Sequence, residues 1–395
     1  MIFQALDDKE QCVGIYADGK LYFEGFPDKL THTWKYSGSL KNTPAQFAWL
    51  YAAGRPPEDM CPDEWKEELF AVQRKLRAYK KSFVLGKIDL HSHCFFDLIP
   101  QDFLLRFCEI KNRITAHVFE TVERPANYEH LDACQRLLHK IKHQNLNVNP
   151  EDCKNLFVNT SLRTECQKIL KGHHYINYNL FGTITGRLAS YPESFPILTM
   201  KKELRRLIKP RNDWFLSLDY NGAEARTLLA LSGEEQPTED IHAWNMQHIF
   251  KEEKVHREEA KTLFFAWLYN PDSHVINAPA YDRQKILDKH YNGEYINTVF
   301  GRIIKVNGWK ALNYLIQSTT ADLVLDRAVA IDKLLEDKKS FISHIVHDEI
   351  VVDFADEDRE LVPEVKNMFA NNKLGNFRVN LQAGKNYFEL DMLKL

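Results

Sequence analysis

The segment Trp214-Phe-Leu-Ser-Leu-Asp219 has the apolar run of a buried strand and ends on a carboxylate. Residues Ala223 to Leu231 follow it with a helical pattern that Ser232-Gly233 would close. A strand that leads into a helix predicts a fold of mixed helices and sheet, with Asp219 held on a rigid element. Taken alone, Asp219 is more simply explained as the cap of that helix.

A second acid, Asp348, lies at the polar turn between two β-rich runs over Phe341 to Phe354. Taken alone, it is more simply explained as a turn residue. Two acids on rigid elements, brought together from distant parts of the chain, would repel each other unless a cation lay between them. The pair Asp219 and Asp348 therefore suits a site with two Mg²⁺ ions that serves in-line phosphoryl transfer.

A helix predicted over Val255 to Tyr269 carries two cations and then two aromatic rings at steps of four: Arg257, Lys261, Phe265 and Tyr269. Each step of four drifts by about 40° around an α-helix, so these side chains share one slowly winding stripe. Arg and Lys suit a triphosphate, and aromatic rings suit a stacked base. Taken alone, the helix could about equally well place its two cations on the protein surface and its two aromatic rings in the core.

The overall charge is nearly balanced, with 52 Lys and Arg against 55 Asp and Glu in 395 residues. With 44% hydrophobic residues, the composition is globular and excludes disordered, collagen-like and coiled-coil chains. The balance argues against a protein that coats nucleic acid by bulk positive charge. However, Lys201 to Arg211 holds six cations in eleven residues just before the Asp219 strand, where a phosphate backbone could pass. Such runs also form solvated faces.

Seven cysteines are scattered without a C-x-x-C pair, which indicates a reduced, intracellular chain without a disulfide framework or zinc ribbon. The N-terminus lacks the pattern of a signal peptide, and no run reaches the roughly 18 apolar residues of a membrane span. We therefore expect a cytoplasmic location and no membrane partner.

The front of the chain predicts compact structure without recognisable chemistry. Asp18-Gly19 between two β-rich runs predicts a hairpin, and Thr43 to Lys81 is helical with a break at Gly54 to Pro57. Residues 101–145 predict long helices with interleaved charge, either a solvated amphipathic hairpin or an arm that faces nucleic acid.

Taken together, the motifs of the second half resemble those of the family A DNA polymerases, the bacterial DNA polymerase I type. The matches, in the order of the family, are Thr185 to Leu188, motif A at Asp219 to Arg226, Asp240 to His242, motif B at Arg257 to Tyr269, Asn313 with Gln317 to Asp322, and motif C at His347 to Glu349. The resemblance covers residues 178–395. Phe103 to Lys142 is similar more loosely to the thumb helices of phage members.

The resemblance implies an α+β fold of the right-hand polymerase type, with an antiparallel palm sheet, helical fingers and thumb, and a small N-terminal α/β block. The implied parts are 1–85 for that block, 86–177 for the thumb and connecting helices, 178–232 and 310–395 for the two parts of the palm, and 233–309 for the fingers.

It also implies which residues carry the chemistry. Asp219 and Asp348 would hold two Mg²⁺ ions, for which Mn²⁺ could substitute, with the backbone carbonyl of Tyr220 as a further ligand. Glu349 would support this site. Lys261 would donate a proton to the leaving pyrophosphate.

Other residues would bind the nucleotide and the primer. Arg257, Lys261 and His242 would bind the incoming triphosphate, Phe265 would pack against the sugar and base, and Tyr269 would guard the templating position. Glu224 would be a steric gate against the ribose 2′-hydroxyl. The residues implied at the primer terminus are Arg187, Asn313, Gln317 and His347, the first three as readers of minor-groove acceptors.

Several positions depart from the family pattern. Asn270-Pro271 replaces the glycine that follows the motif B tyrosine, and Trp309, with Lys310 beside it, replaces a basic residue. Gly222 stands where bacterial members have glutamine, which resembles phage enzymes. The fingers segment, about Gly233 to Gly308, is short. The first 85 residues look too few for the family's proofreading domain and show no cluster of paired acids, so we expect no full 3′–5′ exonuclease domain.

The expected function is a template-directed, DNA-dependent DNA polymerase without intrinsic proofreading, active in replication or repair of a phage or plasmid type. Its expected partners are primer-template DNA, dNTPs and a separate exonuclease or processivity factor. We expect a monomer in the cytoplasm, that of the host if the chain is viral.

Three other functions compete with this expectation. Glu224 weighs against a single-subunit RNA polymerase-like nucleotidyltransferase. A two-metal nuclease has no use for the Arg257 to Tyr269 stripe. A catalytically silent primer-template binding protein would not need both aspartates and Lys261.

Overall fold

The computed structural model describes residues 1–9, 13–90, 92–156, 159–250, 255–270, 278 and 280–394. The chain forms two compact units, Met1–His139 and Lys140–Leu395, each of which is described here by itself. The boundary at His139 falls within residues 86–177, the segment expected to be the thumb. The division into N-terminal block, thumb, fingers and two palm segments stays a prediction.

The N-terminal unit begins with an antiparallel sheet of β1 (Phe3–Leu6), β2 (Gly14–Ala17) and β3 (Lys20–Tyr22), in that order. The predicted turn is confirmed, because Ala17 pairs with Lys20 around it. Asp18 and Gly19 both have positive φ angles, 47° and 74°, as a two-residue turn between twisted strands requires.

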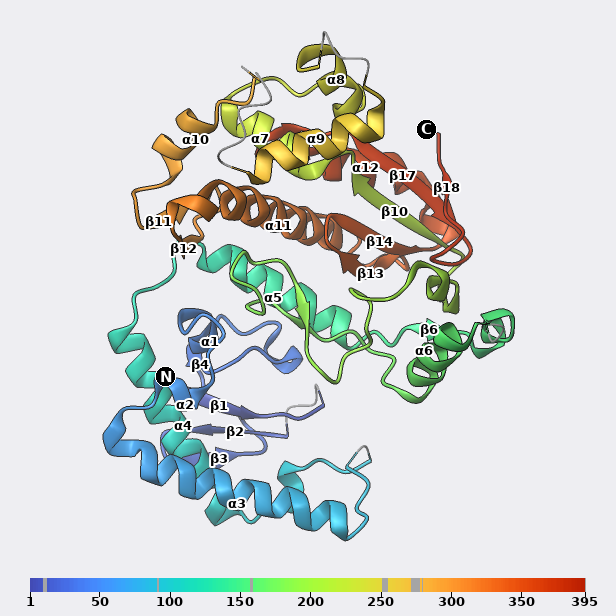
Figure 1. Ribbon diagram of the computed structural model, residues 1–395. Coiled ribbons are helices and arrows are strands. Elements are labelled where there is room, and N and C mark those ends of the chain that lie inside the picture. Colours follow the sequence, from blue (N-terminus) through green and yellow to red (C-terminus); the bar gives the residue numbers. More distant parts are fainter. Residues whose placement is uncertain are drawn as a thin grey trace. The chain divides into compact units, whose positions relative to one another are not determined.

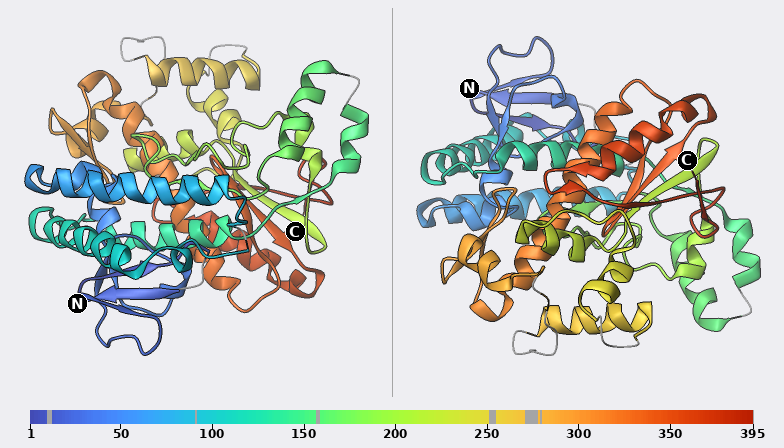
Figure 2. Two further views of the ribbon diagram at one scale, coloured as in Figure 1. Left: turned by 90° about the horizontal axis from the view of Figure 1, so that it is seen from below. Right: turned by 90° about the horizontal axis from the view of Figure 1, so that it is seen from above.

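Helix α4 (Gln101–Thr121) packs against this sheet, and α1 (Ala48–Tyr51), α2 (Pro57–Met60) and α3 (Lys66–Leu85) pack on α4. The first strand of the parallel pair β4 (His32–Thr33) and β5 (Gln46–Phe47) contacts β1 and α4. The predicted break before Pro57 is confirmed, since Ala53 and Gly54 adopt positive φ. The Gln4 amide of β1 donates to Asn112 and Thr115 of α4, at 2.8 and 3.1 Å, and α3 lies along α4 (Figure 2).

The predicted helices over 101–145 are confirmed as α4 and α5 (Tyr128–Lys142). Helix α5 spans the boundary between the units. Its buried apolar residues recur three or four positions apart, as one helix face requires. They are Leu131, Cys134, Leu137, Leu138 and Ile141.

The C-terminal unit is built on a five-stranded antiparallel sheet in the order β13-β14-β10-β17-β18 (Figure 1). The strands are β10 (Trp214–Tyr220), β13 (Phe341–Val346), β14 (Glu349–Phe354), β17 (Val379–Gly384) and β18 (Asp391–Met392). Both predicted β segments are confirmed. Asp219, near the end of the central strand, pairs with Glu349 on one side and Asn380 on the other.

Helices α11 (Gly308–Leu334) and α12 (Val362–Ala370) pack on each other and against this sheet, and α7 (Ala223–Ser232) packs on α11. Helix α7 ends as predicted at Gly233, which takes the left-handed conformation at φ 88° and returns its N–H to the helix. The predicted helix at 311–335 is confirmed and begins slightly earlier, at Gly308.

A second core surrounds the predicted fingers helix. This part holds α8 (Ile241–His248), α9 (Arg257–Tyr269), α10 (Arg283–His290) and the hairpin of β11 (Tyr295–Asn297) and β12 (Ile303–Lys305). Buried residues of α7, α9, α10 and α11 meet here, among them Leu228, Phe264, Ile286 and Leu315. Helix α9 is confirmed and ends before an extended Asn270; Pro271 lies outside the described residues.

The remaining elements of this unit are small. They are α6 (Thr160–Lys171) and three two-stranded pairs, β6 (Asn147–Val148) with β9 (Ile208–Lys209), β7 (Tyr178–Asn179) with β8 (Ala189–Ser190), and β15 (Asn371–Asn372) with β16 (Gly375–Asn376).

Two cysteines form a disulfide, Cys153 with Cys166 of α6. The expectation of an entirely reduced chain is therefore wrong for this pair. The spacing of cysteines in sequence does not show which of them the fold brings together.

No helix within the described ranges is long and apolar enough to cross a membrane.

Candidate active site

The C-terminal unit contains an open pocket at the end of β10 that gathers most of the residues predicted from sequence. Its lining consists of Arg187, Asp219 to Glu224, His242, Arg257, Lys261, Phe265, Thr320, Ala321, His347, Asp348 and Asn380. These residues come from separate elements, since β10, α7, α8, α9, α11, the β13–β14 turn and β17 all contribute. Tyr269, Glu349, Asn313 and Gln317 are predicted site residues outside this lining.

The two predicted acids lie in this pocket. The Asn380 amide donates to Asp219 Oδ2 at 3.1 Å. Burial raises the pKa of Asp219 to about 7, and the charge of Asp348 adds to that rise. Burial also raises the pKa of Asp348. Each ionised carboxylate disfavours ionisation of the other, and a bound cation would stabilise both ionised forms.

This donor set fits divalent ions such as Mg²⁺, which prefer carboxylate and carbonyl oxygens. The Tyr220 hydroxyl donates to the Phe369 carbonyl at 2.6 Å, away from the pocket, so Tyr220 can offer the pocket only its backbone. In the described part of the chain, no group of three or more His, Cys, Asp or Glu side chains forms a ready metal cage. Water and substrate phosphates would complete the coordination, as is usual for Mg²⁺.

Glu349 belongs to β14 of the five-stranded sheet and lies outside the pocket lining. Its carboxylate accepts hydrogen bonds from Ser217 Oγ at 2.6 Å and from the Tyr387 hydroxyl at 2.7 Å. Both contacts tie β14 to other segments of the C-terminal unit. The support that Glu349 gives to the metal site remains a prediction.

Helix α9 presents its stripe to the pocket in the predicted order. Arg257, Lys261 and Phe265 line the pocket. The rings of Phe265 and Tyr269 are stacked, with centroids 5.8 Å apart and planes 16° from parallel. The spacing of four therefore places cations and then aromatic rings along one side of the site.

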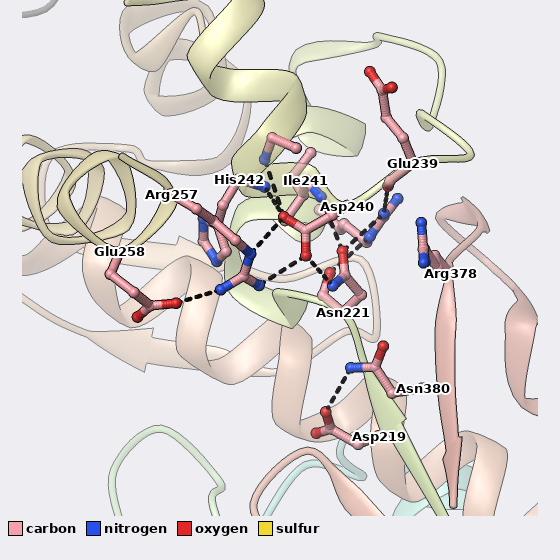
Figure 3. A network of polar contacts seen from close by, with 12 residues as sticks. Asp219, Asn221, Glu239, Asp240, Ile241, His242, Arg257, Glu258, Arg378 and Asn380 are labelled. Carbon is pink, nitrogen blue, oxygen red and sulfur yellow. Dashed lines mark hydrogen bonds and ion pairs between the residues drawn. The ribbon is translucent and has the colours of Figure 1, made fainter. Parts of the chain in front are cut away.

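Arg257 is held by Asp240, at the centre of the network in Figure 3. Its Nε donates to Asp240 Oδ1 at 3.1 Å and its Nη2 to Oδ2 at 2.7 Å. The same carboxylate caps α8 by accepting from the backbone N–H groups of His242 and Ala243. Burial opposes the charge on Asp240, but hydrogen bonds from Arg257 and Asn221 prevail and lower its pKa.

Asn221 and Arg226 connect this network to motif A. Asn221 donates to Asp240 Oδ2 at 2.7 Å and accepts from the Ile241 N–H at 2.9 Å. Arg226 is fully buried, with 0% exposure, and donates to the carbonyls of Asn221, Pro237 and Glu239. Burial lowers the pKa of Arg226 to about 10. Sequence reasoning gave neither residue a role, although a cation inside the apolar α7 pattern was a usable signal.

His242 and Gly222 lie against each other. His242 is buried, its Nδ1 has no hydrogen-bond partner among the described residues, and burial lowers its pKa. Gly222 has a φ of 67°, and a Cβ there would lie 2.4 Å from Ile241 Cγ2 and 3.4 Å from His242 Nε2. The close approach of α8 therefore requires glycine at position 222, where bacterial members of the family have glutamine.

Glu224 joins two residues that were predicted to act separately. Its carboxylate accepts hydrogen bonds from Arg187 and from the Tyr269 hydroxyl. Burial, together with the neighbouring Glu224, raises the pKa of Tyr269. Although Tyr269 lies outside the pocket lining, it is coupled to the pocket through Glu224.

The remaining predicted primer residues lie on α11 and in the β13–β14 turn. Asn313 and Gln317 are one helical turn apart on α11, and Asn313 Oδ1 is buried without a partner among the described residues. His347 lines the pocket from the turn. Trp309, which replaces a basic residue of the family, is 66% exposed.

Arg302 is a further residue of the site that sequence reasoning missed. Its guanidinium donates to both carboxylate oxygens of Asp322, at 2.9 and 2.6 Å, and Asp322 is completely buried. A Cβ on Gly186 would lie 2.5 Å from Arg302 Cζ, and Gly186 has a φ of 77°. Arg302 therefore supports the loop that carries Arg187.

Comparison with known proteins gives a curated relative and a group of solved structures, one of which is a polymerase domain. The relative is the thermostable DNA polymerase I of Thermus aquaticus, 26% identical over 242 residues, which cover 48% of this chain and 29% of the relative. The chain therefore matches less than a third of that relative's length. No family model matches the sequence.

The solved structure is the POL domain of Pol1 from M. smegmatis, described as a complex with DNA primer-template and dNTP. It aligns with a TM-score of 0.59 at 14% identity and covers 73% of this chain and 76% of that chain. This likeness confirms the predicted α+β fold of the polymerase type.

Proposed function

We propose that this chain, which resembles the family A DNA polymerases in sequence motifs and in fold, is a template-directed DNA polymerase. It would add deoxynucleotides to the 3′ end of a primer. The observation that carries the proposal is the convergence of Asp219, Asp348 and the α9 stripe in one pocket. Neither acids alone nor a cation–aromatic helix alone would require this chemistry, but a nucleotidyl transfer site needs both.

The residues fit a site for two divalent ions. Asp219, Asp348 and the backbone carbonyl of Tyr220 would hold Mg²⁺, for which Mn²⁺ could substitute. Bound there, the ions would supply the positive charge that in-line phosphoryl transfer needs. Glu349, fixed by Ser217 and Tyr387, would keep β14 in register beside Asp219.

Helix α9 and His242 would bind the triphosphate. Arg257 offers a guanidinium that can grip phosphate oxygens bidentately, and Lys261 offers a point charge. Lys261 would donate a proton to the leaving pyrophosphate. His242, buried and with a lowered pKa, would approach the phosphates mainly as a neutral imidazole.

The choice of deoxynucleotides would rest on Glu224. Phe265 would pack against the sugar and base, and Tyr269 would hold the templating position. The hydrogen bonds of Glu224 with Arg187 and Tyr269 fix the carboxylate and leave it little freedom to move aside for a 2′-hydroxyl. Closure of α9 over the nucleotide would make base-pair shape a condition for chemistry.

Arg187, Asn313, Gln317 and His347 would contact the primer terminus, with Arg302 as a support for Arg187. Residues 86–177 would form the thumb, 178–232 and 310–395 the palm, and 233–309 the fingers. We further propose a phage- or plasmid-type replication or repair role without intrinsic proofreading, as a cytoplasmic monomer that works with a separate exonuclease or processivity factor.

Primer extension tests the proposal. Asp219→Asn and Asp348→Asn should each abolish extension with Mg²⁺ and with Mn²⁺, while circular dichroism shows an intact fold. Asp337→Asn is a matched control, because Asp337 is an exposed turn residue outside the pocket. Extension retained by both pocket variants would contradict the proposal.

Two further arms of this experiment test the choice of nucleotide and the absence of proofreading. Ribonucleotides offered in place of deoxynucleotides separate a DNA polymerase from an RNA polymerase-like enzyme. A primer with a mismatched 3′ end, incubated with Mg²⁺, should not become shorter. Shortening that survives in Asp219→Asn would contradict the absence of proofreading.

A further inference from the structure

Helix α3 of the N-terminal unit carries an unbalanced positive charge. From Leu69 to Ile88 the sequence contains six cations, Arg74, Lys75, Arg77, Lys80, Lys81 and Lys87, and no acid. The whole chain, in contrast, has a formal net charge of -3. Like charges three and four residues apart destabilise a helix, so folding alone does not favour this pattern.

Three of these cations form a stripe along the solvent face. Arg74, Arg77 and Lys81 follow each other at steps of three and four, and all three are exposed. The opposite face of α3 contains its buried residues, Leu69 and Val72, and α4 packs along the helix. Arg74 and Lys81 therefore point away from the core of their own unit, while Arg77 also lines an open pocket with Leu69 and Phe107.

Within the described part of the chain, the stripe forms no ion pair with an acid: no carboxylate pairs with Arg74, Arg77 or Lys81. Elsewhere in the same unit, exposed cations do find such partners, as Arg113 does with Glu68 at 2.7 Å and Lys66 with Asp63 at 2.6 Å. Lys75 is not counted in the stripe, because its Nζ lies over the rings of Tyr79 and Phe103.

We propose that the Arg74–Arg77–Lys81 stripe of α3, none of whose residues lines the catalytic pocket, binds the phosphate backbone of DNA. The choice of DNA over another polyanion rests on the proposed polymerase function. From Arg74 to Lys81 the helix advances about 10 Å, which matches roughly three nucleotide steps of one strand. Contacts of this kind add affinity without sequence preference.

The salt dependence of binding tests this surface. Each phosphate contact contributes about 0.9 to the slope of log affinity against log salt concentration. The full-length Arg74→Gln/Arg77→Gln/Lys81→Gln variant should therefore bind a fluorescein-labelled primer-template more weakly, with a slope smaller by about 2 to 3. Gln retains helix propensity, and circular dichroism checks that α3 remains folded.

Two matched variants separate the stripe from general charge and from packing. Lys20→Gln/Lys29→Gln/Lys333→Gln removes the same charge at exposed sites elsewhere and should keep the parental slope. Arg74→Lys/Arg77→Lys keeps the charge of the stripe and should also keep that slope. An unchanged slope in the stripe variant, or an equal change in the variant at Lys20, Lys29 and Lys333, would overturn the proposal.

Binding and catalysis are measured separately here. The stripe variant should extend primers at the parental rate once DNA is saturating, because none of its residues lies in the pocket. If the parental chain fails to extend primers, the proposed function is wrong. The salt dependence of its DNA binding would still test the α3 stripe in that case.

Discussion

Arg257 donates two hydrogen bonds to one carboxylate, Asp240, and this places the first cation of the α9 stripe under the control of the residue that caps α8. Asn221, two residues beyond Asp219, holds the same carboxylate. The strand that carries Asp219, the cap of α8 and helix α9 are therefore linked through Asp240. A triphosphate that binds Arg257 must compete with Asp240 for the guanidinium.

Asp240→Asn should lower the KM for dNTP. Asparagine can still cap α8, but it loses the charge that holds Arg257. Since both side chains are partly exposed, the ion pair contributes at most about 1 kcal/mol, which corresponds to a KM change of up to about fivefold. Steady-state extension at varied dNTP concentration measures this change.

Glu258→Gln is the matched control for that variant. Glu258 is the other carboxylate paired with Arg257, but it is well exposed and caps no helix. Its loss should change the KM by less than about twofold. A KM that rises in Asp240→Asn would show that Asp240 positions Arg257 for the nucleotide and does not compete for it.

Glu224→Ala should admit ribonucleotides. Removal of the carboxylate opens the space next to the sugar and also frees Arg187 and Tyr269 from their shared acceptor. The ratio of kcat/KM for ribo- over deoxynucleotides should rise about tenfold or more. Glu224→Gln, which keeps the size of the side chain, should change this ratio far less; equal ratios in the two variants would argue against a steric gate.

Arg302→Ala should destabilise the C-terminal unit strongly. It would remove the guanidinium that donates to both carboxylate oxygens of the buried Asp322, and breaking a buried ion pair costs about 3 to 5 kcal/mol. Arg302→Leu/Asp322→Leu removes both charges and should recover much of that loss, as denaturant unfolding would show. If Arg302 also supports Arg187, the double variant should still bind primer-template more weakly.

The sequence predicted the main elements because their signals are local. Apolar runs of a few residues and steps of four define the β10 strand, the β13–β14 hairpin and α9 without knowledge of tertiary structure. The same reasoning found the two acids, because each lies at an end that the pattern itself marks. Arg187, Glu224 and His242, which also line the pocket, were predicted only from the resemblance to the family motifs.

The rest depended on contacts between segments that are distant in sequence. Arg302 meets Asp322 and Gly186 only once the β11–β12 hairpin folds against α11. Likewise, Asp240 was predicted only as part of a motif, and its hold on Arg257 depends on how α8 and α9 pack. The disulfide of Cys153 and Cys166 was missed for the same reason.

Acid should destabilise the C-terminal unit through His344. This side chain is fully buried against Phe215 and Tyr387, its Nε2 has no partner among the described residues, and burial, with a further effect of Arg205, lowers its pKa to about 3. The unfolded chain takes up a proton near pH 6.5, whereas the folded chain does not until about pH 3. Stability is therefore intact above pH 6.5 and falls by about 1.4 kcal/mol per unit as the pH drops below it.

His344→Leu should remove this dependence. Urea unfolding of the parent and the variant at pH 7 and at pH 4.5 would measure it, with the parent losing about 2 to 3 kcal/mol more than the variant between the two conditions. Equal losses would show that other groups account for the acid sensitivity.

Gly222→Ala should be far more harmful than a glycine replacement that only strains the backbone. At Gly19 the φ is 74° and a Cβ would meet nothing within 4 Å, so Gly19→Ala isolates the strain, about 1 to 2 kcal/mol. At Gly222 a similar strain combines with a Cβ 2.4 Å from Ile241 Cγ2, and overpacking adds about 1 to 3 kcal/mol. Because relief of that clash would displace α8 with His242, Gly222→Ala should also raise the KM for dNTP. Thermal unfolding and extension kinetics on both variants test this, and equal destabilisation without a KM effect would show that α8 can yield freely at this position.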